Sequence, residues 1–120
     1  MEITEIVKKA RKVLPAPDWI MDLTDMSFIW VSPKGLKMIG RDSYTPGSVT
    51  ARDIIDMPNQ TPEQVNEKLM ESLRKEKGTG EVNINTTIGK KIRIKYKFQI
   101  LIIENTYYEV NKIISYAYEK

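Results

Sequence analysis

The sequence of 120 residues contains no cysteine and no histidine. Disulfide bonds, thiolate nucleophiles, imidazole bases and Cys or His metal ligands are therefore absent, which excludes a catalytic triad or a structural zinc site built from this chain alone. No apolar run approaches the roughly 20 residues that cross a bilayer, and the N-terminus is charged and amphipathic, unlike a signal peptide. We therefore expect a cytoplasmic protein that does not bind membranes.

The excess of positive over negative charge is also small. The chain has 19 basic and 16 acidic residues, which gives a net charge of +3. This excess does not by itself argue for binding to nucleic acid. The hydrophobic share of 41% and the charged share of 29% are ordinary for a soluble globular protein, and the length suits a single domain.

The chain begins with a predicted amphipathic helix, residues 1–14, and continues with a predicted domain, residues 18–118. The segment Leu14-Pro15-Ala16-Pro17 ends the helix, because a residue before proline is disfavoured in the helical region. The apolar residues of the helix recur at helical spacing and form one stripe: Ile3, Ile6, Val7, Ala10, Val13 and Leu14. We expect this stripe to cover the domain's own sheet or to pair with a second copy of the chain.

A strand passes directly into a short helix near residue 32. The aromatic and β-branched run 28–31 favours a strand, and residues 18–23 predict its partner in a hairpin. Ser32 can cap the helix, Pro33 suits its first position, and Gly40 can end it with a positive φ. The sequence therefore predicts a hairpin followed by a compact helix.

A longer helix is predicted to begin after Thr61. Thr61 and Gln64 have the spacing of a capping box, and we expect Gly78 and Gly80 to close the far end of this helix. From about residue 80 the apolar residues alternate with polar ones, which predicts strands at about 80–86, 91–103 and 106–118. The second half of the chain is therefore expected to form a sheet.

The order and spacing of several of these residues resemble a PAS domain. Ser32, Gly40, Gly47 and the segment Asp53-Ile54-Ile55 match the front half of the family's pattern, and residues 18–28 resemble its first hairpin. The resemblance continues to about residue 118. It implies an α+β fold, in which a five-stranded antiparallel sheet carries short helices on one face and is accompanied by the N-terminal amphipathic helix.

The resemblance also implies a sensory or regulatory domain of signal transduction. Such a domain binds a small ligand non-covalently, mediates protein–protein interaction and dimerisation, or does both. We expect a homodimer and a signalling output domain or partner protein. The cofactor is left open, but the absence of Cys and His excludes the flavin–cysteinyl adduct of LOV domains, the thioester chromophore of yellow-protein types and a histidine-ligated haem.

In the family, small molecules lie between the sheet and the helices. The residues expected to face this space are Met21, Met38, Ile39, Ile54, Ile55, Leu69, Ile84, Ile94 and Tyr96. Methionine and tyrosine suit an adaptable pocket with one polar tip, whereas aliphatic residues at these spacings are also what an ordinary core requires. A ligand-free dimerisation scaffold with a filled core is therefore the alternative.

Basic residues alternate along the strand predicted at 91–103. They are Lys91, Arg93, Lys95 and Lys97. Because side chains alternate across a strand, all four share one face, which is either a solvated surface or a binding site for an acidic partner or nucleic acid. No aromatic residue interleaves them, so we do not expect bases to stack there. Leu101 and Ile103 continue the same face and predict a docking site for the N-terminal helix, in its own subunit or in a partner's.

Some acidic residues could be considered as catalytic or metal-binding carboxylates. They are Asp22, Asp25, Asp53 and Asp56. All lie at hairpin or helix ends, where aspartate commonly caps backbone N–H groups, so we predict no enzymatic activity and no metal site.

The chain also has Tyr116-Ala117-Tyr118 where sensory PAS domains commonly have an Asp-Ile-Thr motif that leads to an output helix. Signal transmission through that motif is therefore not expected.

Overall fold

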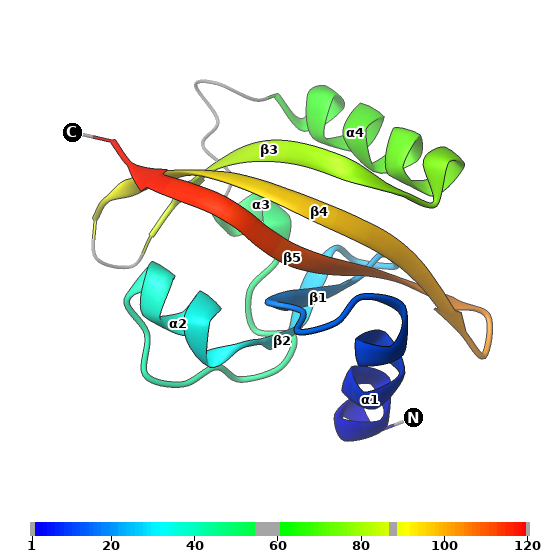
Figure 1. Cartoon of the computed structure of the whole chain (residues 1–120). Helices are drawn as coiled ribbons and strands as arrows, with labels where there is room; N and C mark the ends of the chain where they lie inside the picture. Colours follow the sequence, from blue (N-terminus) through cyan, green and yellow to red (C-terminus); the bar gives the residue numbers. More distant parts are fainter. Residues whose placement is uncertain (1, 55–60, 87–88, 120) are drawn as a thin grey trace.

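The computed structural model describes residues 2–54, 61–86 and 89–119. Within these ranges the chain forms four helices and five strands (Figure 1). In chain order they are α1 (Ile3–Val13), β1 (Trp19–Asp22), β2 (Ser27–Val31), α2 (Pro33–Ile39), α3 (Ala51–Ile54), α4 (Pro62–Lys75), β3 (Lys77–Asn85), β4 (Lys91–Ile103) and β5 (Thr106–Tyr118). None of the helices in these ranges is long and apolar enough to cross a membrane.

The strands form one antiparallel sheet in the order β2-β1-β5-β4-β3, which places β5 at its centre. The helix α1 covers one face, here called the outer face, while α2, α3 and α4 pack toward the other, the inner face (Figure 1). Apolar clusters lie on both faces, so the sheet separates two parts of the core. The predicted fold, an α+β domain with a five-stranded antiparallel sheet, is confirmed.

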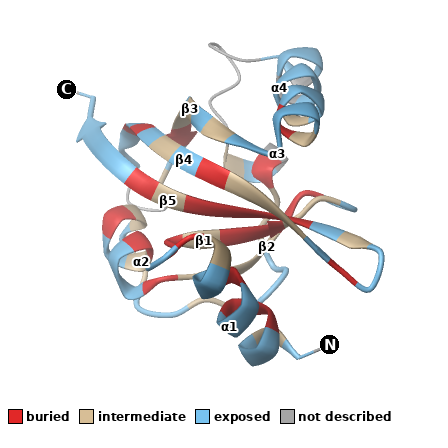
Figure 2. Ribbon diagram, turned by 45° about the vertical axis from the view of Figure 1, so that its right-hand side comes forward, coloured by how far each residue is buried: buried red, intermediate tan, exposed pale blue. Residues whose placement is uncertain are grey.

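The helix α1 packs on the outer face of its own sheet. Its residues Ile6, Val7 and Ala10 are buried, and Figure 2 shows that buried and exposed positions occupy different sides of the helix. The apolar side of α1 forms one cluster with residues of four strands: Ile20, Ile29, Trp30, Leu101, Ile103, Tyr108 and Val110. The stripe predicted from the sequence is therefore covered within a single chain.

Two adjacent isoleucines at the end of β4 provide a test of this packing. Ile103 belongs to the cluster under α1 and is 6% exposed, whereas Ile102 is 58% exposed. Ile103→Val removes one buried methyl group and is expected to lower the free energy of unfolding by about 1 kcal/mol. Ile102→Val makes the same chemical change at the surface and, at a protein concentration low enough to keep the chain monomeric, should alter it by less than about 0.5 kcal/mol. Urea unfolding measures both; equal losses would contradict the docking of α1 on this face.

The predicted helix caps are confirmed. The hydroxyl oxygen of Ser32 accepts the backbone N–H of Gly35 at 3.0 Å, and Gly40 ends α2 in the left-handed region with a φ of 76°. Thr61 and Gln64 form the predicted capping box at the start of α4. These contacts satisfy backbone groups that a helix end otherwise leaves unpaired. Local sequence signals therefore determine where α2 and α4 begin.

The prediction for the far end of α4 is wrong. The left-handed residue after this helix is Glu76, with a φ of 65°, and β3 follows at once, so Gly78 and Gly80 lie inside the strand. In the pairing with β4 they lie opposite Phe98 and Tyr96, whose rings occupy the space that a side chain on β3 would need. Both glycines therefore serve packing across the strands and do not terminate the helix.

Candidate ligand-binding cavity

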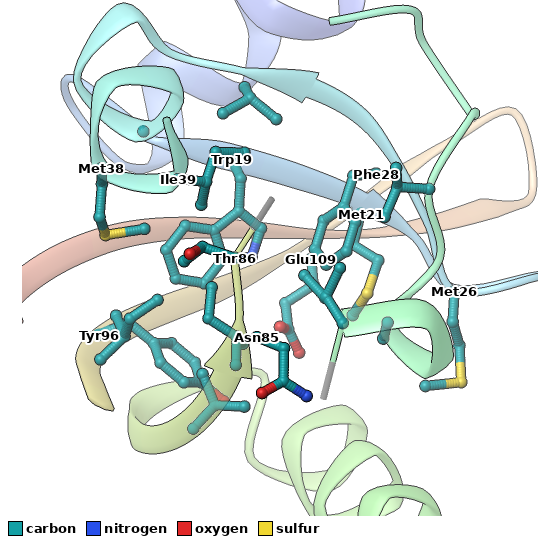
Figure 3. Close-up of a pocket in the computed structure, with 18 of the residues that line it drawn as sticks. Trp19, Met21, Met26, Phe28, Met38, Ile39, Asn85, Thr86, Tyr96 and Glu109 are labelled. Atoms are coloured by element: carbon teal, nitrogen blue, oxygen red, sulfur yellow. The ribbon is translucent and has the colours of Figure 1, made fainter. Parts of the chain in front are cut away.

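A cavity of about 150 Å³ lies between the inner face of the sheet and the helices α2, α3 and α4 (Figure 3). Side chains from every strand of the sheet line it, together with side chains from these helices. The site therefore depends on the whole fold and not on a single motif. An apolar cavity of about this volume can hold a molecule the size of benzene.

Every predicted pocket residue in the described part of the chain lines this cavity. These residues are Met21, Met38, Ile39, Ile54, Leu69, Ile84, Ile94 and Tyr96. The remaining candidate, Ile55, lies outside the described residues. The helical and strand periodicities of the sequence thus identify side chains that the fold brings around one space.

Several apolar residues that line the cavity were not predicted, among them Trp19, Met26 and Phe28. Trp19 and Phe28 belong to the short strands β1 and β2, and Met26 lies in the turn between them. Alternation along β1 could have found Trp19, because it lies two residues before Met21 and so on the same face. Met26 adopts a positive φ of 62° and its side chain is buried. No local pattern signals this placement, since positive φ is uncommon for a residue other than glycine.

The most important residue missed by sequence reasoning is Glu109. It lies on the central strand, opposite Met21 of β1 and Ile100 of β4, and it is 5% exposed. Figure 3 shows its carboxyl group projecting into the cavity. Its sequence neighbours Tyr108 and Val110 contact the cluster under α1, so strand alternation turns Glu109 inward. Burial of a glutamate is rare unless it has a partner, so composition alone gives no reason to expect it.

The environment of Glu109 disfavours its charged form. Burial raises the pKa of Glu109 to about 7, although a hydrogen bond from the side chain of Asn111 acts in the opposite direction. The side-chain amide nitrogen of Asn111 also donates to the backbone carbonyl oxygen of Glu109 at 3.0 Å. The Oδ1 of Asn111 is fully buried and has no hydrogen-bond partner in the part of the chain that the structure covers. A buried carboxylate in these surroundings is costly unless a cation or further donors reach it.

Tyr96 of β4 forms part of the wall beside Glu109. Its ring meets Trp19 edge-on, with 5.4 Å between the ring centroids. Burial and the nearby charge of Glu109 raise the pKa of the Tyr96 phenol, so this group stays protonated. Gly80 leaves room for the ring, because a Cβ atom there would lie 2.8 Å from the Tyr96 hydroxyl oxygen. The glycine therefore helps to fix the shape of the cavity wall.

Gly80→Ala is expected to push the Tyr96 ring toward the cavity. Because the cavity can accept the ring, we expect the loss in the free energy of unfolding to be about 1 kcal/mol, the lower end of the range for overpacking. Contact with Trp19 changes when the ring moves, so tryptophan fluorescence reports the displacement. Gly78→Ala is the matched control, because its Cβ would lie 3.2 Å from Phe98, which does not line the cavity. Identical emission spectra for Gly80→Ala and the wild type would contradict this account.

The predicted interaction residues lie together on the outer side. All belong to the cluster between α1 and the sheet: Ile3, Ile6, Val7, Ala10, Val13, Leu14, Leu101 and Ile103.

The basic side chains from Lys91 to Lys97 are exposed on β4. Lys95 lies opposite the acidic Glu81 of β3, and the Arg93 Nε donates to the side-chain oxygen of Asn83 at 3.4 Å. The basic row is therefore exposed to solvent and has an acidic neighbour on β3.

The aspartates considered for catalysis bind backbone groups instead. Asp22, Asp25 and Asp53 accept the N–H groups of Thr24, Ser27 and Thr50 respectively. Asp56 lies outside the described residues. Across residues 2–54, 61–86 and 89–119, no group of three or more acidic side chains is arranged to hold a metal ion. The described aspartates thus have the turn and capping roles that their positions predicted.

This sheet order, with helices enclosing a cavity on one face, defines an α+β domain of the PAS fold. A PAS domain of an HTR-like protein from Haloarcula marismortui is 16% identical, with a TM-score of 0.60 over 92% of this chain and 93% of its own. A PAS domain of a protein from Colwellia psychrerythraea is 18% identical, with a TM-score of 0.61 over 94% and 98%. A PAS domain from a two-component sensor histidine kinase is 12% identical, with a TM-score of 0.60 over 92% and 96%. No family model and no curated protein matches the sequence.

Proposed function

We propose that this chain is a sensory domain of signal transduction that binds a small ligand non-covalently in the cavity. The observation that carries this proposal is an open space of about 150 Å³ between the sheet and the helices. Protein interiors are close-packed and contain few voids larger than a water molecule, so such a space favours a ligand site over a filled scaffold. The fold shared with a domain of a two-component sensor histidine kinase is consistent with this role.

The central strand offers a route from the cavity to the outer face. Glu109 faces the cavity, while Tyr108 and Val110 on either side of it contact the cluster under α1. A ligand that binds two packings of this strand with different affinity would shift their populations, and α1 would report the change to an output domain or partner protein. This role needs no reaction, so we propose that the chain itself is not an enzyme.

We also propose that the chain forms a homodimer. Its α1 stripe is already covered by its own sheet, but Ile102 and Tyr107 pair across β4 and β5 and are exposed. An exposed apolar pair of this kind gives a second copy a place to bind. Analytical ultracentrifugation should show a concentration-dependent dimer that Ile102→Lys weakens. A wild type that stays monomeric at all concentrations would overturn this part of the proposal.

Mass spectrometry of the purified protein tests ligand binding directly. A small molecule that is present under native conditions and is lost on denaturation would support the sensory function. Met21→Trp is a useful comparison, because the larger side chain fills part of the cavity and should reduce the amount of bound molecule while circular dichroism confirms folding. Clean apoprotein, with no stabilisation by a library of benzene-sized compounds, would favour the ligand-free scaffold.

A further inference from the structure

The chemistry of the cavity is set by one acidic side chain among many apolar ones. Glu109 is the acidic residue among those that line it, and it projects from the strand at the centre of the sheet (Figure 3). In the described structure the side-chain amide of Asn111, on the same strand, supplies its hydrogen bond. One amide leaves most of the hydrogen-bonding capacity of a carboxylate unused. The cavity therefore presents an acceptor that lacks a charged partner.

The cationic side chains that line the same cavity do not fill this role. They are Arg41, which follows α2, and Lys68 of α4. Lys68 is exposed, and its ammonium group donates to the backbone carbonyl of Glu81 at 3.0 Å. Burial raises the pKa of Glu109 and Asn111 lowers it in part, and neither cation contributes to the shift. Glu109 is thus unneutralised by the part of the chain that the structure describes.

Aromatic rings surround the carboxyl group of Glu109. Trp19, Phe28 and Tyr96 come from three different strands, and Figure 3 shows their side chains around the same space. The faces of aromatic rings attract cations, most strongly where water is excluded. Methionine side chains, including Met21, supply adaptable apolar walls between the rings. Together these groups suit a molecule that has both a positive charge and a compact hydrocarbon part.

We propose, resting on the ligand-binding function above, that the ligand is a small organic amine whose protonated nitrogen binds the Glu109 carboxylate. Its apolar part is about the size of one benzene ring, because that is what a cavity of this volume holds. An anionic ligand attracted by Arg41 and Lys68 is the competing possibility. The two classes differ in which side chain binds the charged group, so they can be separated by matched compounds.

Benzylamine, benzyl alcohol and benzoate provide that comparison, because they share one ring and differ in the charge of a short substituent. Isothermal titration of the full chain should show binding of benzylamine and at least about tenfold weaker binding of the other two. Glu109→Gln should weaken benzylamine by about 30-fold or more, as expected when one partner of a buried charge pair is removed. It should leave benzyl alcohol nearly unchanged. Glu104→Gln, which alters an exposed carboxylate in the β4–β5 turn, is the control and should change neither.

The pH dependence of benzylamine binding gives a second readout. The amine binds the ionised form of Glu109, whose pKa is about 7 in the free protein, so affinity should rise between pH 5 and pH 8. Tyr44, Tyr96, Arg41 and Lys68 also line the cavity. Any part of the pH dependence that they cause will remain in Glu109→Gln, whereas the part that belongs to Glu109 will disappear. A pH profile that is identical in the two proteins would overturn the proposal.

The outcomes distinguish the ligand class from the broader function. Equal binding of benzyl alcohol and benzylamine, or benzylamine binding that Glu109→Gln leaves intact, would overturn the amine class and retain ligand binding. Preferential binding of benzoate would also overturn it and would favour an anion held by Arg41 or Lys68. If none of the three compounds binds at millimolar concentration, the amine proposal fails. The sensory function is then judged separately by whether a molecule co-purifies with the protein.

Discussion

Asp18→Ala is expected to lower the free energy of unfolding by about 4 kcal/mol. Asp18 is buried immediately before β1, and its carboxylate links two distant parts of the chain. One oxygen accepts the hydroxyl of Ser32 at 2.8 Å, and the other accepts the backbone N–H of Ile113 at 2.8 Å. Alanine would leave both donors buried without an acceptor, and each such loss costs about 1–3 kcal/mol.

Two further variants test whether the fall in the free energy of unfolding comes from the lost hydrogen-bond acceptors of Asp18 or would follow from replacing any aspartate. Asp18→Asn keeps one acceptor for Ile113 and presents an amide to Ser32, whose hydroxyl can accept, so we expect about half the loss. Asp22→Ala lies at the other end of β1, where the carboxylate accepts the N–H of Thr24 in an exposed turn, so the loss should stay below about 1 kcal/mol. Urea unfolding at pH 7 measures all three variants. Asp18→Ala and Asp22→Ala with equal losses would contradict the structural role of Asp18.

The role of Asp18 shows what a local reading of the sequence cannot find. Asp18 could be placed in the first hairpin, but its partner Ile113 lies 95 positions away. Nothing near either residue signals that contact, because it depends on how β1 pairs with β5. The caps at Ser32 and Thr61 were predictable for the opposite reason, since each cap and its partner lie three residues apart. Short-range chemistry is readable from the sequence, and sheet pairing is not.

The glycines of β3 show a second limit. Gly78 and Gly80 follow a helix, so local rules favour a helix terminus, and glycine suits that position. In the structure the left-handed residue is Glu76, and the glycines make room for aromatic rings on β4. Choosing between these roles requires knowing that Tyr96 lies opposite Gly80. A residue without a side chain carries no pattern that would reveal its neighbour across a sheet.

The candidate cavity was predictable in its apolar walls but not in its polar group. Hydrophobic periodicity identified residues such as Ile84 and Ile94, because burial of alternate side chains is repeated along β3 and β4. The pattern in β5 is irregular. Ile113 and Tyr116 lie opposite Tyr96 and Ile94 although they are three residues apart, because the pairing register shifts between those positions. The face of each β5 residue, Glu109 included, is therefore clear only once the register is known.

Glu109→Gln is expected to stabilise the protein by about 3 kcal/mol at pH 8 and to change little at pH 4. Burial raises the pKa of Glu109 from an ordinary 4.5 to about 7, and one pKa unit corresponds to about 1.4 kcal/mol. Below pH 4.5 the carboxyl group is protonated in both the folded and the unfolded chain. As the pH rises from 4.5 to 7, the unfolded chain loses this proton first, so the folded state becomes less stable. Above pH 7 the penalty is constant, and glutamine avoids it.

Urea unfolding of wild type and Glu109→Gln between pH 4 and pH 9 measures this difference, with Glu104→Gln as the exposed control whose curve should run parallel to the wild type. A gap between wild type and Glu109→Gln that is the same at pH 4 and pH 8 would contradict the assignment of a buried, unneutralised carboxyl group. A saturating amine provides the complementary result. If an amine binds the ionised carboxylate, it stabilises the wild type at pH 8 far more than Glu109→Gln. A low free energy of unfolding in the unliganded wild type at pH 8, together with its recovery when an amine binds, would identify Glu109 as a ligand-binding group that destabilises the free protein.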